Sequence, residues 1–159
     1  MPRRGRSQLG EQRIFFATTT TKDFQNVFDT PESLRKLREI IVEAVKRHCA
    51  KLYGYVLMPN HFHLLIGLEK GGPDLSAFMR DVKSMSWRLI FPGRPGFWMA
   101  RFDDVAVFTE DQLRTKLNDI HNNPVKAGLA ATPESYEFSS ARAWLREDDN
   151  SIVATEFDG

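Results

Sequence analysis

His61 and His63 are the residues of this sequence best suited to chemistry. They stand two positions apart in the apolar run His61–Leu68, whose composition favours a β-strand. Because side chains alternate across a strand, both imidazoles point to one face while Phe62 points to the other. Neutral imidazole binds divalent ions, so the pair supplies half of a metal site. A His-x-His pair is also common by chance, and the rest of the sequence has to decide between these interpretations.

The sequence predicts a sheet that holds the pair. Strands are expected at 13–20, 53–58, 61–68 and 105–108, the middle two as an antiparallel hairpin that turns at Pro59-Asn60. Helices are expected from Thr30 to about residue 50, from Asp74 to Pro92, from the capping box Thr109–Gln112 to Pro124, and over 139–146. This order predicts an α+β fold, a ferredoxin-like sandwich with a central antiparallel sheet and helices packed on it.

Composition indicates a single globular domain. The chain has 159 residues, of which 42% are hydrophobic and 27% charged. No apolar stretch reaches the length of a membrane span, and the first residues lack the apolar region of a signal peptide. The single cysteine, Cys49, cannot form an internal disulfide, which fits the cytoplasm, and its place near the end of a predicted helix suggests a core position.

The charge is divided unevenly along the chain. Residues 1–100 carry 16 Lys and Arg against 9 Asp and Glu, whereas residues 101–159 carry 6 against 12. We expect a basic flexible arm over 1–10, one domain over 11–146 and an acidic tail over 147–159. A basic body suits a polyanion such as DNA, although an unevenly charged but merely solvated surface gives the same counts.

Several segments together resemble one family over roughly residues 12–146. The stretch Tyr55–His63 reads YVLMPNHFH and the stretch Ile120–Leu129 reads IHNNPVKAGL. Three further segments agree with them: Met79–Lys83, Phe97–Phe102 and Pro133–Ser140. The chain resembles the REP-associated tyrosine transposases, a branch of the single-tyrosine HUH transposases with a transposase IS200-like domain.

The resemblance implies cleavage and rejoining of single-stranded DNA beside a hairpin. In the family a divalent ion is held by the two histidines and polarises the scissile phosphate. For this chain the expected ion is magnesium or manganese. A tyrosine on a helix then attacks the phosphorus and forms a 5′-phosphotyrosine link. The cation offsets the negative charge that builds on oxygen, and the covalent link conserves the bond for rejoining. The resemblance assigns His61, His63 and Asn123 as metal ligands.

Asp119 stands where the family has its nucleophilic tyrosine. A carboxylate suits hard divalent cations, so Asp119 is either an additional metal ligand or a solvated acid on a helix. It is a poor nucleophile for this chemistry, because an acyl phosphate is readily hydrolysed. Tyr136 is the candidate substitute nucleophile, although its segment fits a packing role better. For His121 we expect a buried hydrogen-bonding role.

Candidate DNA contacts fall into two groups. The basic arm can reach a groove or the DNA backbone, and cations of the domain can line a phosphate path beside a stacking tryptophan. Solvated charge and core packing are the competing interpretations. The residues are Arg3, Arg4 and Arg6 of the arm, and Lys83, Arg88, Trp98 and Arg101 of the domain.

Three functions stay open at this point. The first is a transposase-like protein that recognises single-stranded or hairpin (REP-type) DNA and has lost its tyrosine nucleophile. The second is an active single-strand DNA transposase or endonuclease that uses Tyr136 or a metal-bound water. The third is an unrelated small-molecule metal hydrolase on the same scaffold, which fold alone does not exclude. Monomer and homodimer are both compatible with the sequence.

Overall fold

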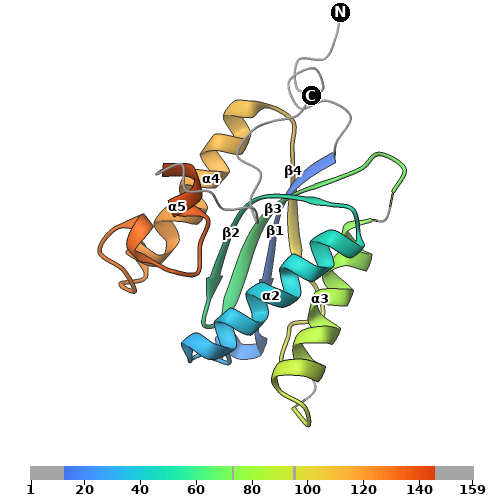
Figure 1. The fold of residues 1–159 in the computed structure, drawn as a ribbon, viewed down its shortest axis with the longest axis vertical. Helices are drawn as coiled ribbons and strands as arrows, with labels where there is room; N and C mark the ends of the chain where they lie inside the picture. The colour runs from blue at the N-terminus through green and yellow to red at the C-terminus, as the bar shows by residue number, and fades with distance from the viewer. Residues whose placement is uncertain (1–12, 73, 95, 146–159) are drawn as a thin grey trace, which may run out of the picture.

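A computed structural model describes residues 13–72, 74–94 and 96–145, and Figure 1 shows their arrangement. The arm predicted over 1–10, with Arg3, Arg4 and Arg6, and the tail predicted over 147–159 lie outside the described residues. Along the chain the elements are β1 (Arg13–Thr20), η1 (Lys22–Phe24), α2 (Pro31–Arg47), β2 (Lys51–Met58), β3 (His61–Leu68), α3 (Leu75–Ile90), β4 (Asp103–Val107), α4 (Glu110–Lys126), η2 (Pro133–Ser135) and α5 (Ala141–Leu145).

The four strands form one antiparallel sheet in the order β2-β3-β1-β4. With α2 between β1 and β2 and α3 between β3 and β4, this is the predicted ferredoxin-like arrangement. The strand with the two histidines is therefore an inner strand, held by neighbours on both sides. Its register with β1 sets Thr18 opposite His63 and Thr20 opposite His61.

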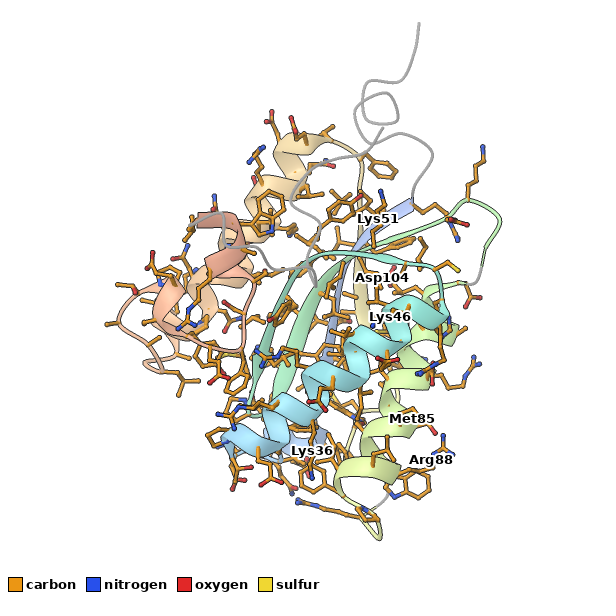
Figure 2. The ribbon with its side chains drawn as sticks, in the orientation of Figure 1. Lys36, Lys46, Lys51, Met85, Arg88 and Asp104 are labelled. Carbon is orange, nitrogen blue, oxygen red and sulfur yellow. The ribbon has the colours of Figure 1, made fainter. Side chains whose placement is uncertain are left out.

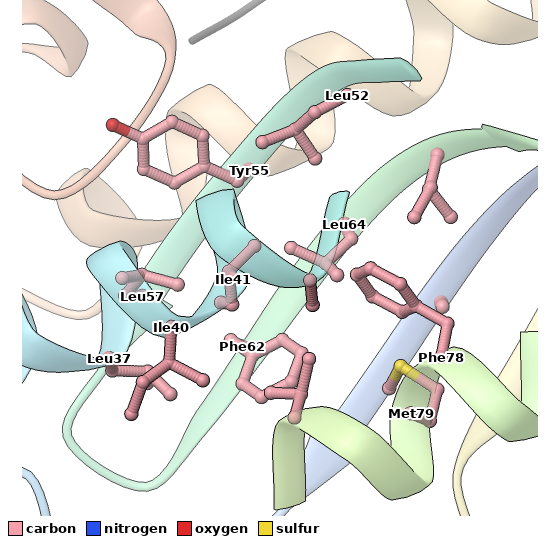
Figure 3. Packing of buried hydrophobic residues seen from close by; sticks show 14 of the residues in the cluster. Leu37, Ile40, Ile41, Leu52, Tyr55, Leu57, Phe62, Leu64, Phe78 and Met79 are labelled. Atoms are coloured by element: carbon pink, nitrogen blue, oxygen red, sulfur yellow. The ribbon is translucent and has the colours of Figure 1, made fainter. Parts of the chain in front are cut away.

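Helices cover both faces of the sheet. α2 and α3 pack on one face over a core in which Leu37, Ile41, Phe62 and Phe78 are buried, and their outward sides carry exposed side chains such as Lys36 (Figures 1 and 2). Figure 3 shows this core from close by. α4 covers the other face, over a second cluster of buried residues: Ile14, Tyr53, Val56, Met58, Leu65, Val107, Leu113, Leu117 and Ile120. Since side chains alternate along β3, Phe62 joins the first core and His61 and His63 face the α4 side.

The predicted helix starts are confirmed by their caps. Thr30 accepts a hydrogen bond from the Ser33 amide, and Asp74 accepts one from the Ala77 amide. Thr109 forms the predicted capping box with Gln112. Among the described residues, no helix is long and apolar enough to cross a membrane.

Several local predictions differ from the structure. The strand expected at 105–108 is Asp103–Val107, and the strand expected at 53–58 begins at Lys51. α4 does not end at Pro124 but continues to Lys126, because Pro124 is buried in the packed last turn and the amides of Ala127 and Leu129 close that turn behind it. Cys49 is exposed rather than in the core. It follows the end of α2 with a left-handed φ of 52°, and this turn directs its side chain to solvent.

Candidate metal centre and nucleic-acid interface

His61 and His63 lie side by side at the beginning of β3. Their ring centroids are 4.8 Å apart with the planes at 74°, and both side chains are half-buried. Phe62 between them is fully buried on the opposite face of the sheet. The prediction that the two imidazoles share one solvent-reachable face is confirmed.

Hydrogen bonds orient both rings through their Nδ1 atoms. His61 Nδ1 is 2.7 Å from Asn60 Oδ1, which only accepts, so this nitrogen carries the proton and Nε2 keeps its lone pair. His63 Nδ1 is 2.7 Å from Thr18 Oγ1, a hydroxyl that donates or accepts. Partners of this kind orient metal-binding histidines, because they fix which ring nitrogen faces the ion.

Burial and nearby charge keep the two imidazoles neutral. Burial lowers the pKa of His61 below its usual value. The pKa of His63 falls to about 4, mainly through burial and further through the neighbouring His61 and Lys116. Near neutral pH both rings are therefore in the form that binds a cation.

Helix α4 brings a third polar group to the pair. Asn123 is half-buried, and its Nδ2 lies 3.5 Å from His61 Nε2. Half a turn of the side-chain amide exchanges its nitrogen and oxygen, and would place an oxygen atom that can bind a metal ion next to His61 Nε2. Two neutral imidazoles with an amide oxygen form a donor set that suits a divalent ion, so these residues fit the metal that the sequence resemblance implies.

Asp119 lies one turn before Asn123 on α4 and is exposed. Residues four apart share a side of a helix, so its carboxylate is on the side of Asn123. Within the described part of the chain, no three His, Cys, Asp or Glu side chains are grouped closely enough to hold an ion. Ligation by Asp119 stays a prediction, and it requires the side chain to turn toward the histidines.

Four residues at this site escaped the sequence reasoning. Thr18 and Asn60 orient the histidines, Phe16 stacks on His63 with ring centroids 5.1 Å apart at 19°, and Lys116 places its Nζ 5.0 Å from the centre of the Phe16 ring. Only Asn60 carried a signal, because it adjoins His61 in sequence. The other three depend on the register of β1 with β3 and on how α4 crosses the sheet.

Tyr136 is committed to a packing contact. Its hydroxyl donates a hydrogen bond to the Leu57 carbonyl at 2.6 Å, and burial raises the pKa of the phenol to about 12. Both effects oppose formation of a phenolate nucleophile. His121 is buried with Nε2 2.9 Å from Ser140 Oγ, the hydrogen-bonding role expected from the sequence.

The predicted DNA-contact residues of the domain differ in how exposed they are. Trp98 is 7% exposed, packs on Phe28 and Phe62, and donates its indole N–H to Ser86 Oγ at 2.8 Å. At this exposure Trp98 packs mainly as a core residue, which was the competing interpretation, and its role in DNA binding stays a prediction.

The three cations have different surroundings. Lys83 is half-buried, its Nζ donates to the Met99 carbonyl, and burial lowers its pKa. Arg101 is exposed in the loop before β4. Arg88 is exposed on α3, where its guanidinium contacts the sulfur of Met85 (Figure 2). Their roles in DNA binding stay predictions.

The fold and the site together define a ferredoxin-like α+β protein with a candidate metal centre on its central sheet. The match to a family model is more specific: residues 15–102 match the family described as transposase IS200-like. Since this is more than half of the 159 residues, the chain belongs to that family. A REP-associated tyrosine transposase of Escherichia coli (strain K12) is 26% identical over 104 residues. That alignment covers 65% of this chain and 62% of the relative, less than two thirds of its length.

Two solved structures have a similar fold. The structure of a REP-associated tyrosine transposase bound to a REP hairpin superposes with a TM-score of 0.74 at 21% identity, and the alignment covers 100% of this chain and 94% of the other. A putative transposase from Deinococcus radiodurans R1 superposes with a TM-score of 0.54 at 19% identity, covering 70% of this chain and 90% of the other. At these identities the likeness concerns the fold.

Proposed function

We propose that this protein recognises single-stranded or hairpin DNA of the REP type and holds a divalent ion, magnesium or manganese, through His61, His63 and Asn123. The observation that carries the proposal is the oriented, neutral histidine pair with the Asn123 amide beside it. The named functions of the E. coli relative and of the hairpin-bound neighbour support the choice of DNA. Membership of a transposase family argues against the unrelated small-molecule hydrolase.

Each residue of the site has a separate task in this proposal. Asn60 and Thr18 hold the two rings so that Nε2 faces the ion, and Phe16 supports the His63 ring from one side. Lys116 adds a positive charge next to the pair, where a DNA phosphate would approach. A bound ion would supply compensation for negative charge on that phosphate.

The family nucleophile is missing from this arrangement. Asp119 occupies its place on α4, and a carboxylate that attacked phosphorus would give an acyl phosphate, which water hydrolyses readily. Tyr136 is held by the Leu57 carbonyl. We therefore propose recognition of DNA without a stable protein–DNA link.

The proposal is tested by incubating the protein with a labelled hairpin that carries unpaired flanks, in Mn²⁺ or Mg²⁺. We expect tighter binding to the hairpin than to random duplex, and no protein-linked strand after denaturation. Replacing His61 or His63 by Ala should weaken Mn²⁺ binding at least about 10-fold, since even outer partners of metal ligands contribute that much. His48→Ala is the matched control, because His48 pairs with Asp81 on the α2–α3 side of the sheet.

Three outcomes of this experiment decide between the functions. Equal affinity for hairpin and duplex across a salt series contradicts REP-type recognition. A wild-type adduct that Tyr136→Phe abolishes makes Tyr136 the nucleophile and the protein an active transposase. Nicking without an adduct, lost in Asp119→Asn, favours a hydrolytic endonuclease. In the proposed form of the protein, Asp119→Tyr restores the missing phenol and is the variant in which an adduct is expected.

A further inference from the structure

A pocket of about 290 Å³ lies between α3 and the loop that precedes β4. Arg80, Lys83 and Trp87 contribute to it from α3, and Trp98 and Met99 are among the residues that contribute from the loop. The α3 residues are three and four positions apart, so they share one side of the helix. The pocket belongs to the face of the sheet opposite the histidine pair.

The lining of this pocket suits a nucleotide. Trp87 is 37% exposed, in contrast to Trp98 at 7%, so its ring is accessible. Within the described residues no acidic side chain lines the pocket, and neither Arg80 nor Lys83 forms an ion pair. Lys83 is positioned by its hydrogen bond to the Met99 carbonyl at 2.8 Å. An accessible indole beside two cations offers a stacking surface for a base and a binding site for its phosphate.

A second surface pocket beside α3 lacks this character. It lies against α2, has a volume of about 340 Å³, and is lined by Glu39 and Glu43 as well as Lys36 and Arg47. Balanced charges of this kind do not favour a polyanion. Of these two pockets, only the one beside the loop before β4 has basic side chains without acidic ones.

The backbone connects the pocket to the candidate metal centre. The Met99 amide donates to the Thr20 carbonyl at 2.9 Å, and Thr20 pairs with His61 in the sheet. Two strand spacings, roughly 10 Å, therefore separate Met99 from His61. Arg101 follows two residues later in the same loop and is exposed. One short stretch of single strand that passes over this end of the sheet can occupy both places.

We propose that the pocket binds an unpaired nucleotide in the strand that flanks the hairpin, with its base on Trp87 and its phosphate between Arg80 and Lys83. This inference rests on the proposed function, because it assumes that single-stranded DNA reaches the histidine pair. It adds a second recognition site, specific for unpaired DNA, on the other face of the sheet.

The test compares two ligands on the full chain: the hairpin with an unpaired flank and the same hairpin with blunt ends. Trp87→Ala should weaken binding of the flanked hairpin roughly 5- to 150-fold, the range observed for loss of one base-stacking aromatic residue, and leave the blunt hairpin unchanged. Arg80→Gln should weaken the flanked hairpin and reduce the slope of affinity against salt by about one. Matched controls are Leu89→Ala, an exposed residue on the α2 side of α3, and Lys46→Gln on the outer side of α2.

A second measurement does not depend on affinity. Bromouracil placed at each flank position in turn should crosslink to Trp87 from one position only, identified by mass spectrometry. Equal losses for flanked and blunt hairpins, or a crosslink that maps away from α3, overturn the inference while the proposed function stands. Failure of wild-type protein to bind either hairpin contradicts the proposed function itself.

Discussion

Gly54 allows α4 to lie close to the sheet, because it has no side chain. It lies in β2 at a register irregularity with β3, beneath the middle of α4. A Cβ atom added here would stand 2.6 Å from Leu117 Cδ2, 3.4 Å from Ser140 Oγ and 3.7 Å from Leu65 Cδ1. Carbon atoms pack best at about 3.5–4.0 Å, so Leu117 would have to retreat by about 1 Å.

The Leu117 side chain has little room to move. Leu117 is 4% exposed and Ser140 is fully buried, so Gly54→Ala must either force Leu117 out of its preferred rotamer or lift α4. Overpacking of this kind costs about 1–3 kcal/mol of the free energy of unfolding. Lifting α4 also moves Asn123 away from His61. We therefore expect Gly54→Ala to lower both stability and Mn²⁺ affinity.

Urea unfolding of a double-mutant cycle with Leu117→Ala tests the cause. Leu117→Ala alone should cost about 2–5 kcal/mol, because it leaves a cavity. In that background the added methyl group has space, so Gly54→Ala should cost almost nothing, which gives a coupling of about 1–3 kcal/mol. Additive effects within about 0.5 kcal/mol, or a Gly54→Ala variant as stable as the wild type, would refute the reasoning.

The other predictions concern Tyr136 and the N-terminal arm. Tyr136→Phe should lower the free energy of unfolding by about 1–2 kcal/mol at pH 7, because the buried Leu57 carbonyl loses its donor. Since the folded state raises the pKa of Tyr136 from 10.0 to about 12, its contribution is complete below pH 10 and lost as the pH rises toward 12. The wild type should therefore lose stability more steeply than Tyr136→Phe over that interval in urea titrations, and parallel curves would contradict this. Deletion of residues 1–10 should weaken hairpin binding and flatten its salt dependence in proportion to the lost arginines, and an unchanged slope would exclude the arm from the interface.

Local patterns determined much of the fold. The bounds of β1 and β3 were predicted correctly, because both are apolar and β-branched runs, and turn residues flank β3. The starts of α2, α3 and α4 followed from Thr30, Asp74 and Thr109, whose side chains satisfy amides within the same turn. Such interactions join residues a few positions apart, so their geometry is contained in the sequence itself.

The sequence also determined that His61 and His63 share a face, because a strand has a side-chain period of two. Tertiary structure decided what surrounds them. Thr18 reaches His63 only through the register of β1 with β3, and Asn123 reaches His61 only through the packing of α4 on the sheet.

Tertiary structure also decided which of two tryptophans is buried. Trp98 and Trp87 are chemically identical, 11 positions apart in the sequence, and both line the pocket beside α3, yet Trp98 is 7% exposed and Trp87 is 37% exposed. Neither residue type nor the local sequence pattern distinguishes the exposed tryptophan from the buried one. Which ring remains available to a ligand depends on how the loop before β4 folds against α3, and contacts between distant segments fix that packing.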